Sequence, residues 1–476
     1  MKTKLVIMCI ACFLSQPLLA QKFAVTITGT SADSTIKQAR LTKNSPFLDV
    51  YVPTLLSQDM ADNSGRFNLR TEVNQPQIVD LSVGKRSWSV FVSPGDNLTF
   101  EVKNDGQIVF LGQNADNSNF LYSMDSLLRS RKIKKPYFSK RLSIDEYQAK
   151  VDSFFTLKEN FLSNYAQKHS IDLKYLTNAL RYERTASLFA PTSSFITDSL
   201  SLPDHYNKVL EEISFNDAIM LDNLGYTDAL RYKYLLSKSR RGEMQTNFGS
   251  LYSTILSETE NRTREFLVAS LVGMYVANPA PSVDHIPFLV ALDKAIKSTK
   301  DSTYLSYIQE KYNDFMYLNK PIADLVLNAT YLTPYVEGEK LTLGQVLEKY
   351  SEKALYIDFW ASWCGPCRAD IRDSEASKNY LKTQGVEIIY LSIDTDVSLW
   401  KKAAKADGVE SNQYLVTDNL RSNLVKHFGI NYIPRYLLLD KDHKVKNIYA
   451  PRLNKAGYNE LKKAISGSGT KIVTHE

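Results

Sequence analysis

The sequence predicts a multidomain protein of α+β and α/β class, with a β-sandwich-like N-terminal domain, a helical middle region and a C-terminal α/β domain. Three observations lead to this prediction. Apolar and polar residues alternate with period two in residues 21–115, apolar residues recur at helical spacing in residues 116–325, and short strand and helix patterns alternate in residues 326–476. A chain of 476 residues is long enough for about three such parts.

The composition excludes several classes of protein. Hydrophobic residues make up 43% of the chain and charged residues 23%, which is typical of globular proteins and rules out a disordered chain, a collagen or a coiled-coil rod. The formal net charge of +6 is small for this length, so we expect no nucleic-acid partner.

Residues 1–20 have the pattern of a secretory signal peptide. Lys2 and Lys4 precede an apolar run from Leu5 to Leu14, and Ala20 stands before the expected cleavage point. This run is too short to span a bilayer, so a periplasmic or cell-envelope location is expected. The alternative is a buried first strand or helix.

The four cysteines form two pairs. Cleavage would remove Cys9 and Cys12 and leave Cys364 and Cys367. A disulfide that closes so small a loop stabilises little, so redox chemistry explains this second pair better than structural stapling does. A lipoprotein acylated at Cys12 is a further alternative, although its apolar region would be unusually short.

Residues 21–115 predict an antiparallel sheet or sandwich. Alternation is clear from Phe23 to Ile27, from Trp88 to Val92 and from Leu98 to Val102, and turn signals separate these runs. No catalytic constellation is present, and the aromatic side chains are assigned to the core rather than to a binding groove.

Residues 116–325 predict helices. Ser143 is a plausible N-cap, because Asp145 and Glu146 follow it in the expected first turn. Further helices are expected at 173–188, 226–236, 263–275, 287–296 and 304–317. Aromatic residues at helical spacing indicate packing rather than a cofactor site.

Residues 326–476 predict a mixed sheet covered by helices on both faces. Asp396 and Asn454 are expected to cap helices, and Gly429 is expected to end one. The expected strands are 355–360, 386–393, 436–440 and 444–449, and the expected helices are 364–382, 400–406, 420–428 and 455–465.

The segment Cys364-Gly365-Pro366-Cys367 follows a buried strand and begins a helix, which predicts a thioredoxin-like redox site. The helix N-terminus favours the thiolate of Cys364, and the thiolate is the species that attacks a disulfide. Cys367 lies one helical turn away and is expected to be the deeper of the two, with Cys364 accessible. Pro366 fits the first helical turn, and the lack of a histidine between the cysteines predicts a reducing site.

Two alternatives to a redox site are considered. A zinc site would need two further ligands, but the expected mature chain has no other cysteine and its histidines are scattered, so no metal is expected. A purely structural disulfide is the second alternative. No cofactor is expected.

Residues 326–470 resemble the TlpA-like branch of the thioredoxin family, which consists of exported thiol-disulfide oxidoreductases. The resemblance rests on the stretch from Tyr356 to Arg368, which contains WCGPC, and on Gly429-Ile430-Asn431-Tyr432-Ile433-Pro434 before an apolar strand. The layout of the whole chain also resembles long members of this branch from Bacteroidetes-type bacteria.

The resemblance implies roles for residues at matching positions. Cys364 would be the nucleophile and Cys367 the resolving thiol. Asp358 stands in an otherwise apolar strand, where a carboxylate is costly unless its pKa rises, and it would act as general base for Cys367.

Substrate-binding positions are implied in the same way. Pro434 would be a cis-proline, and the backbone of Ile433 would pair with an extended substrate strand. Trp363 would form an apolar rim beside the nucleophile, together with Gly365 and Pro366.

Three departures from the family pattern stand out. The segment from Arg368 to Asp373 lacks a proline found in many relatives, which predicts a straighter helix. Tyr390 stands near the place of a lysine that pairs with the buried aspartate in simple thioredoxins. No acidic residue separates the cysteines, unlike relatives devoted to cytochrome c maturation.

Together these features predict an exported reductase of protein disulfides that receives electrons from a membrane thiol-reductant carrier. The alternatives are a disulfide isomerase or oxidase, and a non-enzymatic envelope binding protein with a thioredoxin scaffold. The oligomeric state is not predicted.

Overall fold

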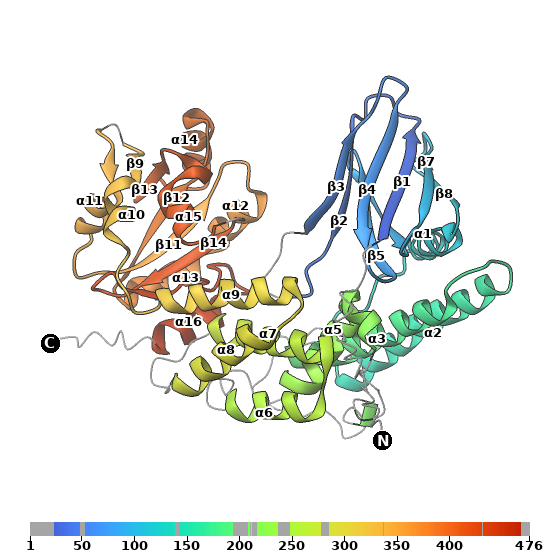
Figure 1. Ribbon diagram of the computed structural model, residues 1–476. Coiled ribbons are helices and arrows are strands. Elements are labelled where there is room, and N and C mark those ends of the chain that lie inside the picture. The colour runs from blue at the N-terminus through green and yellow to red at the C-terminus, as the bar shows by residue number, and fades with distance from the viewer. Residues whose placement is uncertain are drawn as a thin grey trace, which may run out of the picture. The chain divides into compact units, whose positions relative to one another are not determined.

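The computed structural model describes residues 23–47, 53–138, 142–193, 208–209, 211, 217–236, 248–277, 285–336, 338–430 and 432–467 (Figure 1). The predicted signal peptide lies outside these residues. The chain divides into two compact units: Met1–Tyr137, Asp145–Arg184 and Asp222–Leu224 form the first, and Phe138–Ile144, Thr185–Leu221 and Gly225–Glu476 form the second. The domain limits expected at residues 115 and 325 stay predictions.

The first unit contains two four-stranded sheets, which confirms the predicted β-sandwich. Their inward-facing residues, such as Val25 and Ile27 of one sheet and Leu41 and Leu81 of the other, share one apolar core. The sheets have the orders β4-β1-β7-β8 and β3-β2-β5-β6, with β1 Phe23–Ser31, β2 Gln38–Lys43, β3 Thr54–Met60, β4 Arg66–Val73, β5 Gln77–Val83, β6 Arg86–Val92, β7 Asn97–Val102 and β8 Ile108–Gly112.

Helices follow the sandwich, as predicted. In the first unit, α1 (Ala115–Ser130) is tied to it where the Ser118 hydroxyl accepts a hydrogen bond from the backbone N–H of Phe91 at 3.1 Å. The other helices of the region are α2 Ile144–Ala166, α3 Leu173–Ser193, η1 Ala218–Asp222, α5 Leu224–Arg231, η2 Tyr232–Leu236, α6 Phe248–Glu258, α7 Asn261–Ala277, α8 Ile286–Ser298 and α9 Ser302–Tyr317.

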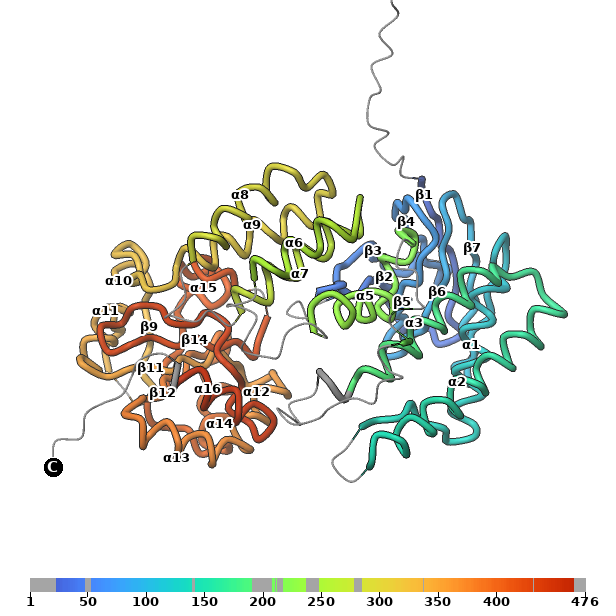
Figure 2. Tube along the Cα trace, turned by 90° about the horizontal axis from the view of Figure 1, so that it is seen from below, coloured from blue at the N-terminus to red at the C-terminus, as the bar shows by residue number. Residues whose placement is uncertain are grey.

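Helices α6 to α9 of the second unit lie side by side (Figures 1 and 2). Gly273 of α7 allows α9 to approach closely, because a Cβ at this position would lie only 1.9 Å from the Tyr307 hydroxyl. Among the described residues, no helix has both the length and the apolar character needed to cross a lipid bilayer.

A seven-stranded mixed sheet of order β10-β9-β13-β12-β11-β14-β15 forms the C-terminal part. Its strands are β9 Tyr331–Pro334, β10 Leu341–Thr342, β11 Ala354–Trp360, β12 Val386–Ser392, β13 Gln413–Val416, β14 Arg435–Leu439 and β15 Val445–Asn447. The central strand β11 runs parallel to β12 and antiparallel to β14. The predicted hairpin and crossover are confirmed, whereas β9, β10 and β13 were not anticipated.

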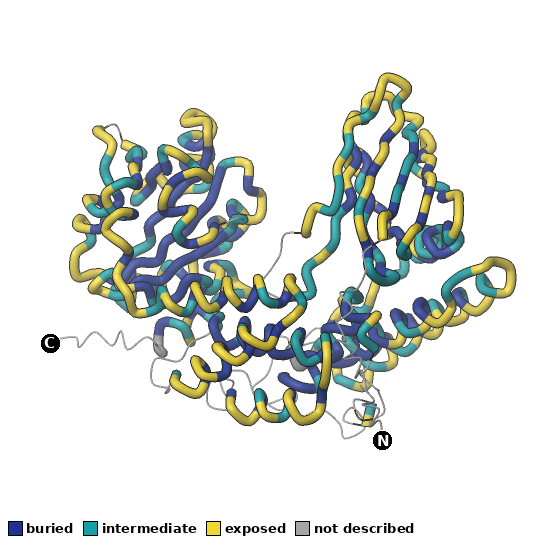
Figure 3. The backbone as a smooth tube through the Cα atoms, viewed as in Figure 1, coloured by how far each residue is buried: buried dark blue, intermediate teal, exposed yellow. Residues whose placement is uncertain are grey.

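Apolar cores on both faces of this sheet explain why every residue of β11 is buried (Figure 3) and why all of them except Asp358 are apolar. Leu355, Ile357 and Phe359 enter one core, whereas Ala354 and Tyr356 enter the other. The surrounding helices are α10 Asp324–Ala329, α11 Leu343–Glu348, α12 Gly365–Arg372, α13 Glu375–Thr383, α14 Val397–Ala406, η3 Asn419–Arg421, α15 Asn423–His427 and α16 Tyr458–Gly467.

Two predicted helix ends are confirmed. The Asp396 carboxylate accepts hydrogen bonds from the backbone N–H groups of Ser398 and Leu399, which caps α14. Gly429 has a φ of 55° just after α15, where its lack of a Cβ permits this left-handed conformation.

The prediction of a straighter helix after the cysteines is wrong, because the helix breaks into α12 and α13 at Asp373 and Ser374. The buried Ser374 hydroxyl donates to the carbonyl of Ile371, and the Asp373 carboxylate accepts from the backbone N–H of Lys455. The Ser374 hydroxyl thus occupies a carbonyl of the last turn of α12, and the bond to Lys455 holds Asp373 at the break, without a proline.

Helix α9 packs against the C-terminal sheet through a buried polar cluster. The Lys311 side chain, only 2% exposed, donates from Nζ to the Tyr449 hydroxyl at 2.8 Å. That hydroxyl donates to the Asp314 carboxylate at 2.8 Å, and the guanidinium of Arg435 lies 3.4 Å from the centre of the Tyr449 ring. This polar cluster therefore joins α9 to the C-terminal part of the chain within the second unit.

Replacing Tyr449 by phenylalanine should destabilise the second unit by about 1–3 kcal/mol, because the buried Lys311 and Asp314 each lose a hydrogen-bond partner. Urea unfolding of the full chain measures the effect. Tyr331→Phe is the matched control, since this half-exposed tyrosine should change the free energy of unfolding by less than about 0.5 kcal/mol. Equal effects of the two changes would contradict the structural role assigned to the cluster.

Candidate redox active site

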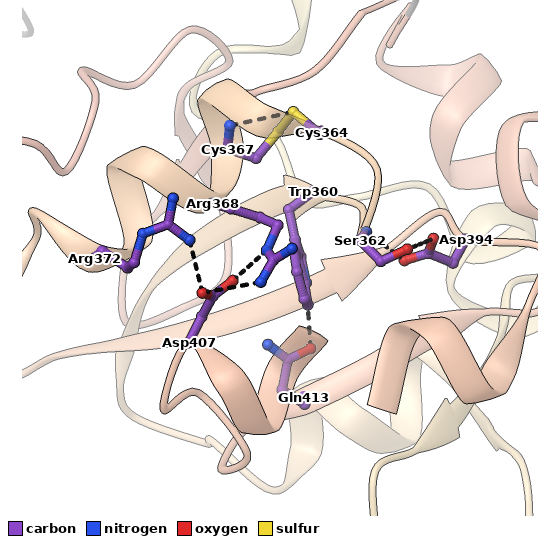
Figure 4. A network of polar contacts seen from close by, with 9 residues as sticks. All are labelled: Trp360, Ser362, Cys364, Cys367, Arg368, Arg372, Asp394, Asp407 and Gln413. Carbon is purple, nitrogen blue, oxygen red and sulfur yellow. Dashed lines mark hydrogen bonds and ion pairs between the residues drawn. A yellow bond between two sulfur atoms is a disulfide. The ribbon is translucent and has the colours of Figure 1, made fainter. Parts of the chain in front are cut away.

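The two cysteines stand where the buried strand β11 passes into α12. Cys364 is the N-cap residue of α12, and its sulfur accepts a hydrogen bond from the backbone N–H of Cys367 at 3.2 Å. The two residues form a disulfide (Figure 4). This N–H group and the positive end of the helix dipole both favour negative charge on the sulfur of Cys364.

The exposure of the cysteines departs from the prediction. Cys364 is only 4% exposed and Cys367 only 1% exposed, so Cys367 is the deeper residue but Cys364 is not accessible in this oxidised form. The reason is geometric, because the sulfur of Cys364 is bonded to the buried Cys367 and lies against the first turn of α12.

Three of the predicted substrate-binding residues adjoin the cysteines in sequence, and the other two, Ile433 and Pro434, directly precede β14. Trp363, Gly365 and Pro366 are exposed, and Pro366 occupies the first turn of α12 as predicted. The Ile433–Pro434 peptide bond is cis, as predicted. Because Arg435 pairs with Phe359, the register places this bond at the end of β11 that leads into residues 361–367, which we call the redox segment.

Asp358 lies in the middle of β11, opposite Tyr390 of β12 and Tyr436 of β14. It is 1% exposed, and its Oδ1 has no hydrogen-bond partner among the described residues. Burial raises the pKa of Asp358 well above its usual value, and the negative charge of Asp370 raises it further. The proton-accepting role implied by the resemblance requires the ionised carboxylate, and a raised pKa makes that carboxylate a stronger base.

The family pattern would place a lysine near the position of Tyr390 on β12, as a partner of the buried aspartate. In this structure a cation that acts on Asp358 from nearby is Lys378 of α13. Its Nζ lies 5.7 Å from the centre of the Tyr390 ring, and Tyr390 is the β12 neighbour of Asp358. Burial lowers the pKa of Lys378, whereas the charge of Asp358 acts in the opposite direction. No sequence pattern pointed to Lys378, because its position depends on the break between α12 and α13.

Asp370 of α12 is the centre of a second buried network. Its carboxylate accepts hydrogen bonds from the Arg452 guanidinium at 2.6 and 2.8 Å, from the Tyr436 hydroxyl at 2.7 Å and from the Asn454 side chain at 2.7 Å. The prediction that Asn454 caps α16 is wrong, because this helix begins only at Tyr458. The Asn454 Oδ1 accepts a hydrogen bond from the backbone N–H of Gly457, in the turn before the helix. These contacts hold α12 in place from segments more than 60 residues away, which a sequence pattern cannot show.

A buried carboxylate also fixes the turn before the cysteines. Asp394 accepts hydrogen bonds from the backbone N–H and the hydroxyl of Ser362, at 2.8 and 2.6 Å (Figure 4). It also accepts one from the Ser392 hydroxyl at 2.7 Å. Because Ser362 is two residues before Cys364, these bonds set the path by which the chain enters α12.

Asp407, at the end of α14, binds two arginines of α12 (Figure 4). Arg368 Nε lies 2.6 Å and Arg372 Nη1 2.8 Å from its carboxylate oxygens. Burial alone would raise the pKa of Asp407, but the hydrogen bonds from the two arginines outweigh burial and lower it. This pairing offsets one of the two positive charges that α12 carries at Arg368 and Arg372.

No cluster of three or more potential metal ligands occurs in the part of the chain that the structure describes. The chemistry that this arrangement supports is thiol-disulfide exchange: an exchangeable disulfide at a helix N-terminus, with a buried carboxyl group in the adjacent strand.

Comparisons with known proteins agree with this geometry. The Redoxin family matches residues 333–464. The C-terminal region is therefore a Redoxin domain with a thioredoxin fold, which confirms the predicted resemblance at that level.

Relatives with known names match the same region. It is similar to the thiol-disulfide oxidoreductase ResA of Bacillus thuringiensis subsp. konkukian, with 29% identity over 111 residues, and to that of Geobacillus thermodenitrificans, with 25% identity over 109 residues. Each alignment covers 23% of this chain and 60% or 61% of the relative, so the chain spans less than two thirds of their length.

Solved structures are similar over the same region. The thioredoxin domain of a thiol-disulfide oxidoreductase from Bacteroides vulgatus is 23% identical, covering 30% of this chain and 99% of that chain, with a TM-score of 0.26. A thiol-disulfide oxidoreductase from Bacteroides fragilis is 26% identical, covering 29% and 98%, with a TM-score of 0.25.

Proposed function

We propose that this protein is an exported thiol-disulfide oxidoreductase that reduces disulfides of other proteins. The observation that carries the proposal is the Cys364–Cys367 disulfide at the N-terminus of α12, which directly follows β11, the strand that contains the buried Asp358. The similarity to the ResA proteins supports the same class of chemistry.

The reaction begins with the reduced dithiol. The thiolate of Cys364 attacks one sulfur of the substrate disulfide, so a mixed disulfide forms and the other substrate sulfur leaves as a thiolate. Cys367 then passes its proton to the Asp358 carboxylate and attacks the sulfur of Cys364. The substrate departs with two thiols, and the enzyme holds the Cys364–Cys367 disulfide after giving up two electrons.

The reducing direction is inferred from the residues between the cysteines. Gly365 and Pro366 carry no charge, and Arg368 and Arg372 are both bound to Asp407, which offsets one of their two positive charges, so few groups stabilise the thiolate strongly. A weakly stabilised dithiol has a low reduction potential, nearer to the ~−270 mV of thioredoxin than to the ~−120 mV of a strong oxidant.

The remaining parts of the proposal concern place and partners. Residues 1–20 would direct the chain to the periplasm or cell envelope. A membrane thiol-reductant carrier would return two electrons to the disulfide, and the substrates would be proteins with disulfides. No nucleic-acid partner is proposed.

The reduction potential tests the proposed direction. We expect the full chain, equilibrated with defined ratios of reduced and oxidised dithiothreitol or glutathione, to give a value close to about −270 mV. Thiol alkylation followed by mass spectrometry measures the oxidised fraction at each ratio. A potential above about −180 mV would place the site in the isomerase or oxidase range and rule out the reductase.

A further inference from the structure

A pocket of about 350 Å³ lies beside the redox segment. Ser362, Trp363 and Arg368 form one side of it, and Leu399, Lys402 and Ala403 of α14 form the other. Trp363 is bonded directly to Cys364, and consecutive Cα atoms are about 3.8 Å apart. A polypeptide whose cysteine is joined to Cys364 would therefore place its neighbouring side chains within reach of this pocket.

The pocket has an exposed apolar side. The side chains of Trp363 and Leu399 are 65% and 54% exposed, although each is large and apolar. Contact with a partner would remove this apolar surface from water, which favours binding of an apolar side chain between them.

The lining of the pocket contains two cations, Arg368 and Lys402. Arg368 is paired with Asp407, whereas the exposed Lys402 has no ion pair among the described residues. The neighbouring carboxylates are already hydrogen-bonded: Asp407 to two arginines, Asp394 to Ser362 and Ser392, and Asp396 to the first turn of α14. The positive charge of Lys402 is thus uncompensated within the described structure.

We infer that this pocket selects the substrate: a protein disulfide whose cysteine is flanked by an apolar residue and by an aspartate or glutamate. The apolar side chain would lie between Trp363 and Leu399, and the carboxylate would pair with Lys402. This inference rests on the proposed function and adds to it the substrate class and a specificity-determining residue.

Disulfide-linked homodimers of three short peptides test the inference. The peptides differ only beside the cysteine, where they carry leucine and glutamate, leucine and lysine, or glycine and glutamate. Prereduced full-length protein is mixed with each in a single turnover, and the second-order rate constant of thiol release is measured. Lys402→Glu is the test variant and Lys405→Glu the matched control, because Lys405 lies on the same helix with the same charge but does not line the pocket.

We expect the wild-type protein to react about fivefold faster with the leucine–glutamate peptide than with the leucine–lysine peptide at low salt. Lys402→Glu should reverse this ratio, and Lys405→Glu should leave it within about twofold. The glycine–glutamate peptide should react about fivefold more slowly than the leucine–glutamate peptide. Screening at 1 M salt, where the Debye length is about 3 Å, should abolish the charge preference but not the leucine preference.

The outcomes separate this inference from the proposed function. If the wild-type protein reduces all three peptides at one rate, or if both variants shift the ratio equally, the pocket does not select substrates and the inference fails. If it reduces none of them and its dithiol also reacts with no protein disulfide, the proposed function itself fails.

Discussion

Replacing Cys367 by alanine should convert the protein into a trap that accumulates mixed disulfides on Cys364 while turnover falls by about a thousandfold or more. Without the second thiol, the covalent intermediate cannot be resolved within the molecule. When catalytic groups act as a unit, removing one of them abolishes most of the rate enhancement. Because Cys367 is small and lies in the first turn of α12, alanine preserves the helix while removing only the sulfur.

Non-reducing electrophoresis of cell-envelope extracts, followed by mass spectrometry, would identify the trapped partners. Cys364→Ser in the same extracts is the control and should give no adducts, since the attacking sulfur is absent. If neither variant accumulates adducts and Cys364→Ser has no phenotype, the thioredoxin scaffold would be a binding module rather than an enzyme. Trapped proteins also show directly whether their cysteines have apolar and acidic neighbours.

The cysteine pair could be recognised from the sequence because its essential parts are contiguous. A buried strand, a tight turn and a helix start occupy the segment from Tyr356 to Arg368, and local rules of chain geometry are sufficient to predict them. Asp358 and Pro434 were found in the same way, one as a charge in an apolar strand and the other before an apolar strand. Their positions in the structure depend only on strand register.

The surroundings of the pair could not be predicted, because they depend on contacts between distant segments. Arg452 is 82 positions from Asp370, and the side chain of Asp394 reaches back 32 positions to Ser362. The Lys311–Tyr449 bond spans 138 positions and joins the helical region to the redox domain. Periodicity predicts which face of an element is apolar, but it does not tell which polar side chains meet across the core.

The break between α12 and α13 shows the same limit on a smaller scale. Helical propensity predicts a single helix over residues 364–382, yet the Ser374 hydroxyl binds the carbonyl of Ile371 at the end of α12, and the Asp373 carboxylate binds the distant backbone N–H of Lys455. The break sets the position of Lys378 near Asp358. The electrostatic partner of the buried carboxyl is thus a consequence of tertiary structure.

Replacing Asp358 by asparagine should stabilise the oxidised protein at neutral pH, and the gain should grow as the pH rises. In the unfolded chain this carboxyl ionises near its ordinary pKa of about 3.9, whereas burial raises the pKa in the folded chain well above that value. Between the two pKa values the folded state keeps a proton that the unfolded state has lost. Raising the pH therefore favours unfolding by about 1.4 kcal/mol per pH unit, and asparagine removes this dependence.

Urea unfolding of the disulfide-bonded protein between pH 4 and pH 8, followed by tryptophan fluorescence, measures the difference in the free energy of unfolding between Asp358→Asn and the wild-type protein. It should be smallest near pH 4, rise with pH and level off above the folded-state pKa of Asp358. Asp394→Asn is the matched control and should destabilise by about 1–3 kcal/mol, because an amide nitrogen cannot accept the hydrogen bonds from Ser362 and Ser392. A stability difference for Asp358→Asn that does not change with pH would show that Asp358 ionises normally in the folded chain, and would remove it as the proton acceptor of Cys367.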